Sequence, residues 1–330
     1  MNLTRFPRKR YTPFATPIEK LEGLTGMYGK NIYIKRDDML GLTGGGNKTR
    51  KLEFLIADAI ARGADEVITC GAVQSNHCRL TLSACGKENL RCHLVLEERV
   101  PGSYNKGANG NNLLFNLIGA ASVTIVPGGS DMLAEMQKVA DSIAARGGKP
   151  YIIPGGGSNE IGALGYVNCA LETMAQLADM HIKMDAIICT SGSGGTHAGL
   201  LTGLVAMNTG IPVVGISISR KAPAQRELVY NLCKKTADFL GLRGAPSMDD
   251  VIVFDEYVGE GYSRPTDGMK TAVKTLAQID GILLDPVYTG KTMDGMMDLL
   301  FKHYFFNAYN ILFLHTGGSP AVYAYMNDLL

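Results

Sequence analysis

A glycine run that ends at a lysine is the first stretch of the sequence whose residue types suggest chemistry. The segment "LTGGGNKTRKLEFL" (42–55) places Lys48 at the start of an expected helix, after a loop almost free of side chains. The apolar residues of this helix recur at helical spacing, and its buried face comprises Leu52, Leu55, Ile56, Ala59 and Ile60. At 100° per residue, Lys48 lies roughly 50° from the centre of that face and Lys51 about 110° from it. Lys48 is therefore expected to point inward and Lys51 towards solvent.

An inward lysine has two interpretations. A buried ammonium is unfavourable unless it is paired or neutralised, and a desolvated lysine has a lowered pKa that suits Schiff-base formation with a carbonyl. Alternatively, the ammonium of Lys48 reaches solvent at the helix start while its alkyl stem covers apolar surface. The helical phase alone leaves both interpretations open.

A second glycine-rich turn, "SGSGGT" (191–196), follows a β-rich run and precedes an apolar helix. Its backbone N–H groups and hydroxyls would lie at a helix N-terminus, where a phosphate is stabilised. Two nucleotide-binding signatures fail. A dinucleotide fingerprint needs a glycine or alanine where this chain has His197, and a P-loop needs its first glycine where this chain has Asp285. The G-x-S-x-G elbow of serine hydrolases is not present either. Two interpretations of the 191–196 turn remain, a cup that binds a phosphate and a plain tight turn between strand and helix. A cup together with an inward lysine suggests pyridoxal phosphate, which carries one aldehyde and one phosphate.

Short β-rich runs that end in glycine or a polar residue alternate with helical patterns along the chain. This alternation is typical of parallel α/β sheets, whose ligands collect at the carboxyl ends of the strands. The stretch 154–165, rich in glycine, is the best candidate for a hinge, and 100–112 is expected to be an exposed loop.

Composition narrows the class of protein. With 330 residues, 46% of them hydrophobic, and a net charge of +1, the chain can bury a large core and has no electrostatic footprint for nucleic acid or an acidic membrane. No signal segment or membrane span is evident, so a cytoplasmic protein is expected. The seven cysteines include no C-x-x-C pair and the six histidines lack ligand spacing. We therefore expect small core cysteines and no metal site.

From end to end, the chain resembles the fold-type II pyridoxal-phosphate enzymes of the D-cysteine desulfhydrase and 1-aminocyclopropane-1-carboxylate deaminase family. The motifs that carry the resemblance are "RFPR", "TPIEKL", "IKRDD", "GGNKTRKLEFL", "GAVQSNH", "GGSNEIGALGY", "SGSGGTHAG", "ILLDPVYTGK" and "FLHTGG". The resemblance implies a tryptophan synthase β-like fold, with two parallel-sheet-rich α/β domains and pyridoxal 5'-phosphate between them. The large domain would comprise 1–50 and 160–330, and a small inserted domain, 51–159, would close on the substrate. A homodimer is also implied.

The family pattern further implies which residues hold the cofactor. Lys48 would form the Schiff base and later move the Cα proton, Asn76 would hydrogen-bond the ring hydroxyl, and Thr316 would face the pyridine nitrogen. The phosphate would be bound by Ser191, Gly192, Ser193, Gly194, Gly195 and Thr196. The glycines 44–46 are expected to remove side chains where the flat ring approaches the backbone.

Substrate contacts are implied in the same way. Ser75, Asn76 and His77 would hold the substrate carboxylate, with Ser75 as a proton-transfer partner. Tyr288 and Tyr262 would reach the reacting end of the substrate. Without the family pattern, Tyr288 and Tyr262 could be packing residues, and His77 could be an ordinary residue at a helix start.

Two positions beside the cofactor ring distinguish the reactions that members of the family catalyse. Ring-opening deaminases of this pattern have a glutamate and a leucine where this chain has Thr289 and Thr316. A hydroxyl does not enforce protonation of the ring nitrogen, so the ring is a weaker electron sink and expulsion of a β-substituent is favoured. The expected reaction is β-elimination from a cysteine-like amino acid to pyruvate and ammonia.

The stretches "PGGSDMLAEM" and "YVGEGYSRPTDG" make the chain most similar to the L-cysteate sulfo-lyases of the family. L-cysteate, which would release sulfite, is therefore the expected small amino-acid substrate, and D-cysteine, which would release sulfide, is the alternative. A sulfonate needs hydrogen-bond donors. The expected donors are Thr43, Gly44, Thr289 and Tyr288, with Arg220 and Lys221 nearby only in sequence. A catalytically silent amino-acid-binding or regulatory protein is the alternative of another class.

Overall fold

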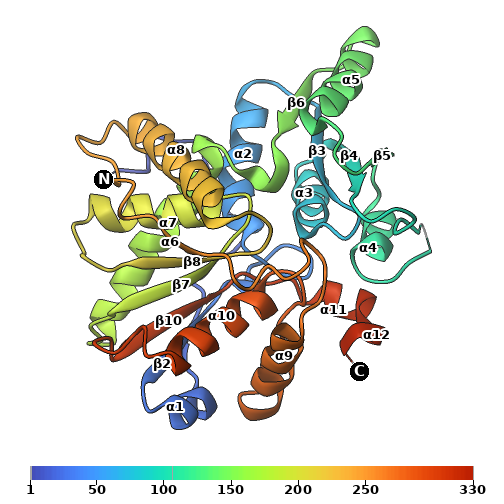
Figure 1. Ribbon diagram of the computed structural model, residues 1–330. Coiled ribbons are helices and arrows are strands. Elements are labelled where there is room, and N and C mark those ends of the chain that lie inside the picture. The colour runs from blue at the N-terminus through green and yellow to red at the C-terminus, as the bar shows by residue number, and fades with distance from the viewer. Residues whose placement is uncertain (1, 106, 330) are drawn as a thin grey trace.

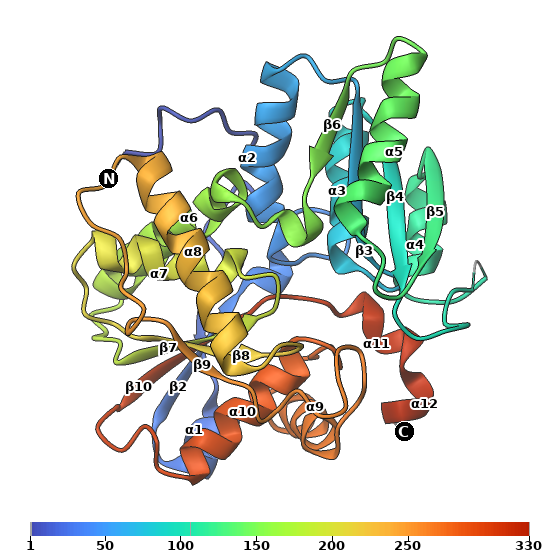
Figure 2. The ribbon, with the colours of Figure 1, turned by 45° about the horizontal axis from the view of Figure 1, so that its top comes forward.

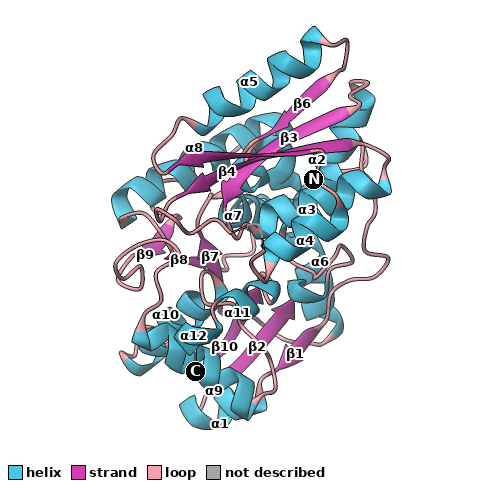
Figure 3. Cartoon of the chain, turned by 90° about the vertical axis from the view of Figure 1, so that its right-hand side faces the viewer, coloured by secondary structure: helices cyan, strands magenta, loops and turns pink. Residues whose placement is uncertain are grey.

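The computed structural model describes residues 2–105 and 107–329 and contains two sheets that lie one above the other (Figure 3). In the larger sheet, every neighbouring pair of strands is parallel except β1 with β2. Its strands in sheet order are β1 (Ile18–Lys20), β2 (Asn31–Arg36), β10 (Asn310–His315), β7 (Ala186–Ser191), β8 (Val213–Ser217) and β9 (Ile252–Phe254). The α/β fold expected from the alternation of elements is confirmed.

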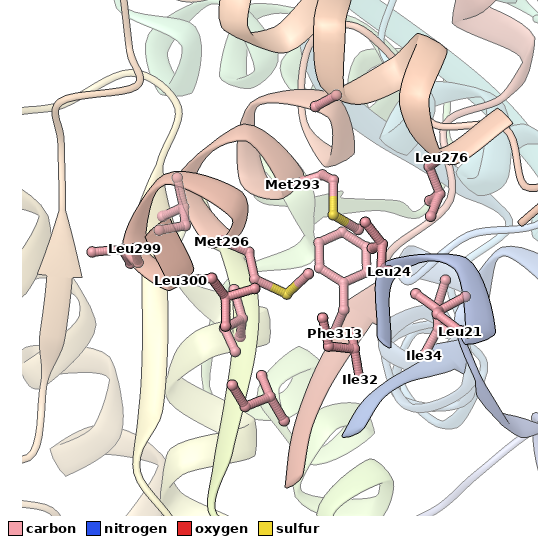
Figure 4. Close-up of a cluster of buried hydrophobic side chains, with 14 of the residues drawn as sticks. Leu21, Leu24, Ile32, Ile34, Leu276, Met293, Met296, Leu299, Leu300 and Phe313 are labelled. Carbon is pink, nitrogen blue, oxygen red and sulfur yellow. The ribbon is translucent and has the colours of Figure 1, made fainter. Parts of the chain in front are cut away.

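Helices cover both faces of the larger sheet (Figures 1 and 2). One face packs against α1 (Glu22–Tyr28), α9 (Asp267–Ile279) and α10 (Thr289–Phe301), and the other against α6 (Glu160–Asp179), α7 (Gly195–Ala206) and α8 (Ala222–Leu240). Strand β10 is apolar on both sides. Ile311 and Phe313 enter one core, whereas Leu312 and Leu314 enter the other. Figure 4 shows Phe313 beside methionines of α10.

The smaller sheet is wholly parallel. Its strands in order are β5 (Ser122–Pro127), β4 (Arg91–Glu98), β3 (Glu66–Ala72) and β6 (Pro150–Ile153). One face packs against α2 (Lys48–Ala61), α3 (Asn76–Lys87) and α4 (Asn111–Ile118), and the other against α5 (Met132–Ala145). These strands lie inside the range 51–159 expected of an inserted domain, and the division into domains itself remains a prediction.

Short elements complete the chain. They are η1 (Asp37–Met39), η2 (Gly155–Gly157), α11 (Pro320–Ala324) and α12 (Met326–Leu329), and α11 lies against α4 of the smaller sheet (Figure 2). All seven cysteines are buried and unpaired, as expected of small core residues. Within the described ranges, no helix has the length and apolar character needed to cross a bilayer.

A buried ionic network fixes α2 to the larger sheet. Arg50 of α2 donates to both oxygens of Asp37 at 2.8 Å, and to both oxygens of Glu172 of α6 at 2.8 and 2.9 Å. Tyr166 also donates to Asp37, and Lys35 of β2 donates to Glu172, each at 2.6 Å. Burial alone would raise the pKa of Asp37, but the Arg50 guanidinium outweighs it and holds that pKa below its usual value. Because Arg50 lies two residues after Lys48, the network also places Lys48.

The approach of α2 to α6 requires a glycine. A Cβ on Gly165 of α6 would overlap the backbone of Arg50. With hydrogen there instead, the two helix backbones come close enough for the side chain of Arg50 to reach both carboxylates.

Removing one carboxylate of this network tests its contribution. We expect Asp37→Ala to lower the free energy of unfolding by about 3–5 kcal/mol, because Arg50 would stay buried without half of its counter-charge. Urea titration of the apoprotein measures the change. Glu19→Ala is the control, since Glu19 pairs with Arg36 at a partly exposed site and should contribute less than about 1 kcal/mol. Equal losses in the two variants would contradict the role of the network.

Candidate active site

A cavity of about 590 Å³ is lined by residues of both sheets and their connections. Its walls include the end of β3 at Ala72, Glu97 of β4, Thr190 of β7 and Thr316 directly after β10. Ligands of parallel α/β sheets collect at this carboxyl end of the strands. The cavity therefore lies at the edge of the sheets where the recurring strand-then-glycine pattern predicts a site.

Lys48 enters the cavity from the first position of α2 and is 9% exposed. Its Nζ lies 4.9 Å from the centre of the Tyr288 ring. Burial lowers the pKa of Lys48 to about 8; the Asp285 carboxylate opposes this shift and the Arg79 guanidinium adds to it. A large fraction of such an amine is neutral slightly above neutral pH, as a nucleophile for a carbonyl must be.

Lys51 corrects one expectation from helical phase, since its side chain is buried rather than solvated. Its Nζ donates to the carbonyl of Gly156 at 3.0 Å and to Oγ of Ser158 at 3.2 Å. Burial, and secondarily the Lys48 ammonium, lowers the pKa of Lys51 well below its usual value. The apolar periodicity located only the face that α2 turns to the smaller sheet. The side of α2 around Lys51 is covered instead by polar groups of the 156–158 connection.

The turn between β7 and α7 forms a cradle beside Lys51. Gly192, Ser193, Gly194 and Thr196 line the cavity, and the first N–H groups of α7 have no partner within the helix. A Cβ on Gly195 would lie 2.8 Å from Nζ of Lys51 and 2.7 Å from Oγ of Ser158. Helix amides, hydroxyls and a lysine around a side-chain-free turn fit a phosphate.

Ser191 is a second correction. Its hydroxyl lies 3.1 Å from Nδ1 of His197 and accepts a hydrogen bond from Gln225 at 2.9 Å. This side chain therefore stabilises the turn on the side away from the cavity and does not contact a ligand. It is fully buried and lies outside the cavity wall.

The glycines 44–46 have a cause other than the expected one. Their φ angles are +71°, +63° and +123°, and none of the three lines the cavity. A Cβ on Gly45 would overlap the carbonyl of Asp38, and one on Gly46 would lie 3.3 Å from the carbonyl oxygen of Thr316. They permit a left-handed turn that packs closely on neighbouring backbone and so delivers α2 to the site.

Asn76, at the start of α3, is oriented by partners that the sequence did not reveal. Its Oδ1 accepts from Arg79 at 2.8 Å and from Asn111 at 2.9 Å, which leaves its amide nitrogen as the free donor. Asn76 lies just outside the cavity wall, between the lining residues Ser75 and His77, so its expected contact with the cofactor ring remains a prediction. Arg79 is fully buried and also donates to the carbonyl of Gly45 at 2.7 Å. Burial lowers the pKa of Arg79 to about 10. No signal in the chain beyond its position, three residues after Asn76, marked this arginine.

Ser75 and His77 line the cavity at the same helix start. Ser75 caps α3, and its Oγ accepts from the amide of Cys78 at 3.2 Å. The Thr69 hydroxyl donates to the carbonyl of Ile153, so it accepts at 2.8 Å from Nε2 of His77, whose Nδ1 has no partner among the described residues. Burial lowers the pKa of His77 well below its usual value. A neutral imidazole supplies no charge for a carboxylate, so this part of the site offers helix amides instead.

Tyr288 and Tyr262 meet opposite Lys48, and their hydroxyls are hydrogen-bonded. Burial raises the pKa of each, so both phenols stay protonated near neutral pH. Asp285 fixes Tyr288 by accepting the amides of 287, 288 and 289 at 2.8–3.0 Å. Lys291 fixes the loop of Tyr262 by donating to the carbonyls of Val258 and Gly261 at 2.7 and 2.9 Å.

Of the two threonines beside the expected ring, the structure brings only Thr316 into the cavity. Thr289 is fully buried; its hydroxyl donates to Asp285 at 2.7 Å and accepts the Asp285 amide at 2.8 Å. The expected contact of Thr289 with the substrate is therefore corrected, because both hydrogen-bonding roles of the hydroxyl are already filled. Thr43 likewise faces Ser83 at 2.9 Å, outside the cavity.

Comparisons with known proteins bear on the family and the fold of the chain. The family described as "Pyridoxal-phosphate dependent enzyme" matches residues 10–317. "D-cysteine desulfhydrase" of Yersinia enterocolitica is 44% identical over 324 residues, 98% of this chain and 97% of that protein. The protein of that name from Salmonella paratyphi C is 42% identical over 325 residues, 98% of each chain. A solved "ACC deaminase homologue" is 37% identical with a TM-score of 0.91, covering 99% of this chain and 96% of that one. A "pyridoxal 5'-phosphate-dependent aspartate racemase", 17% identical with a TM-score of 0.66 over 92% of this chain and 90% of that one, shares the fold.

The assignment of the reactive amine can be tested by trapping. After incubation with pyridoxal phosphate and reduction with borohydride, peptide mass spectrometry should find the pyridoxyl group on Lys48, and on no lysine of Lys48→Ala. Lys51→Met is the matched control and should still be labelled at Lys48. A pyridoxyl group on Lys51 or another lysine in the wild-type protein would overturn the assignment.

The position of Lys51 predicts a selective loss of cofactor affinity. Lys51→Met should weaken binding of pyridoxal phosphate by about 10- to 100-fold, because a charge-assisted hydrogen bond to the phosphate is removed. Spectroscopic titration measures the affinity, and pyridoxal, which lacks the phosphate, is the control ligand. If the variant binds both ligands more weakly by the same factor, Lys51 does not act on the phosphate.

Proposed function

The chain belongs to the pyridoxal-phosphate dependent enzyme family, and from this premise we propose that it is a carbon–sulfur lyase that converts D-cysteine and water to pyruvate, hydrogen sulfide and ammonia. The observation that carries the proposal is the meeting of a desolvated Lys48 and a phosphate cradle in one cavity. The names of relatives 42–44% identical to this chain support the sulfur substrate.

The chain's own residues fit the cofactor. Lys48 would hold its aldehyde carbon, the 192–196 turn and Lys51 its phosphate, the amide of Asn76 its ring hydroxyl, and Thr316 its ring nitrogen. Once bound, the cofactor supplies an electron sink for the pair released when the substrate loses its Cα proton.

The remaining steps belong to side chains. The Lys48 amine, neutral above its lowered pKa, would accept the Cα proton. Amides at the start of α3, with Ser75, would hold the substrate carboxylate where the helix dipole favours negative charge. The Tyr288–Tyr262 hydroxyl pair would donate a proton or a hydrogen bond to the departing sulfur, which lowers the barrier to C–S cleavage. Closure of the smaller sheet over the cavity would exclude water during these steps.

Cyclopropane opening fits the site less well. Thr316 offers a hydroxyl rather than an apolar side chain at the ring, and Thr289 offers no carboxylate. Together these residues favour loss of a β-substituent over a reaction that depends on strong electron withdrawal by the ring.

L-cysteate, which would yield sulfite, is the second candidate substrate. Two of its four expected sulfonate donors, Thr43 and Thr289, are committed to Ser83 and Asp285, and Gly44 lies away from the cavity. This weakens the case made from the sequence. However, Arg99, which directly precedes the stretch 100–112, lines the cavity and offers a donor for an anionic group that the sequence did not reveal.

One paired assay tests the proposal. Holoenzyme incubated with D-cysteine should form equal amounts of pyruvate and sulfide, and incubated with L-cysteate it would form pyruvate and sulfite if the second candidate holds. Tyr288→Phe should lower kcat for D-cysteine by about 10²–10⁴-fold, the range of general acid–base catalysis. A holoenzyme that binds these amino acids without releasing pyruvate would instead indicate a silent binding protein.

A further inference from the structure

Arg99 lies at the meeting of the two sheets, directly after β4. Its side chain crosses from the smaller sheet to the loop after β9 on the larger one, where its guanidinium carbon lies 4.3 Å from the centre of the Tyr262 ring. Tyr262 is hydrogen-bonded to Tyr288, whose ring faces Lys48. Arg99 thus stands at the reacting end of the cavity, across the hydroxyl pair from the amine.

The contacts of Arg99 occupy only one of its nitrogens. Nε donates to Oε2 of Glu97 at 2.5 Å, while Oε1 of Glu97 accepts the amide of Gly129 at 2.9 Å. Within residues 2–105 and 107–329, neither terminal nitrogen of Arg99 has a hydrogen-bond partner. The attraction between the guanidinium and the face of the Tyr262 ring restrains this side chain, which is 41% exposed. A restrained guanidinium with free N–H groups is a preorganised donor.

Other arginines of the site are used differently. Both terminal nitrogens of Arg79 are bonded to Asn76, Asn111 and the carbonyl of Gly45. Arg220 lines the far side of the cavity, where Nη1 donates to the carbonyl of Gly192 at 3.1 Å beside the phosphate cradle. Arg99 therefore combines free donors with a place at the tyrosine pair.

From this geometry we propose that Arg99 forms a subsite for an oxyanionic β-substituent, a sulfonate or sulfinate, on a cysteine-like substrate. The inference rests on the proposed carbon–sulfur lyase activity. The terminal N–H groups of an arginine match two oxygens of such a group in a bidentate pair, which a neutral thiol cannot form. The α-carboxylate is held separately, at the start of α3. The subsite would thus let the lyase bind an oxyanionic sulfur substituent in addition to the thiol of D-cysteine.

Binding of unreactive ligands tests the subsite without turnover. The probes are 3-sulfopropanoate and 4,4-dimethylpentanoate, in which a neutral tert-butyl group replaces the sulfonate. Both keep the carboxylate and lack the amine needed for reaction. By calorimetry on the holoenzyme, the wild-type protein should bind the sulfonate about 10- to 100-fold more tightly than the tert-butyl probe. Arg99→Gln should abolish this preference, and Arg99→Lys, which keeps the charge without the planar fork, should retain part of it.

Arg220→Gln is the matched control, because it removes the same charge from the same cavity. It should leave the preference for the sulfonate unchanged. The proposal is overturned if the wild-type protein shows no preference for the sulfonate or if Arg99→Gln keeps the preference. It is also overturned if Arg220→Gln loses the preference equally, since the sulfonate would then be attracted by the overall positive charge of the cavity.

Kinetics then separate this inference from the proposed function. Arg99→Gln should lower kcat/KM for L-cysteate about 10- to 100-fold more than kcat/KM for D-cysteine. If neither amino acid yields pyruvate with the wild-type protein, the lyase activity fails, while the binding preference still decides the role of Arg99. If turnover occurs and Arg99→Gln slows both substrates equally, the lyase stands and the subsite is wrong.

Discussion

The structure depends on the burial of three cations in the first turn of α2. Lys48, Arg50 and Lys51 are all buried, and burial of charge is unfavourable unless each is compensated. Arg50 is compensated by two carboxylates. Lys51 donates to a carbonyl and a serine hydroxyl, and among the described residues no carboxylate pairs with either lysine. Burial lowers the pKa of Lys48 to about 8 and the pKa of Lys51 well below its usual value. The ion pairs of Arg50 thus hold α2 in place, while the lowered pKa of Lys48 makes its amine reactive. Both sheets pack around this helix.

The cavity is correspondingly rich in positive charge and amide donors. Lys48 and Arg99 line it, and the α7 and α3 N-termini face it from two sides. Lys51 and Arg79 lie outside its wall but interact electrostatically with Lys48. An anionic cofactor and an anionic substrate carboxylate would both be stabilised in such a field. Because the parts come from both sheets, relative movement of the sheets would change the distances between groups that different sheets carry, and closure can couple binding to the exclusion of water.

Sequence reasoning found the parts that repeat a local pattern. The inward Lys48 followed from helical phase, and the strand-end glycines located the cavity. The phase failed for Lys51, because this side chain is buried against polar groups of Gly156 and Ser158, which leave no apolar signature. Glycines 44–46 were assigned to a ligand, although their positive φ angles favour glycine at all three, and a Cβ on Gly45 would overlap the carbonyl of Asp38. Arg79 and Arg99 were missed because their roles arise from long-range packing, which no local spacing records.

The central claim is that the fold itself makes Lys48 a reactive amine before any ligand arrives. NMR titration of the apoprotein with ¹³C-labelled lysine side chains, assigned with Lys48→Arg, measures this directly. The account predicts a Lys48 midpoint at about pH 8, below the ordinary value of 10.5. A midpoint at the ordinary value would show that Lys48 is solvated in the free protein and would contradict the account.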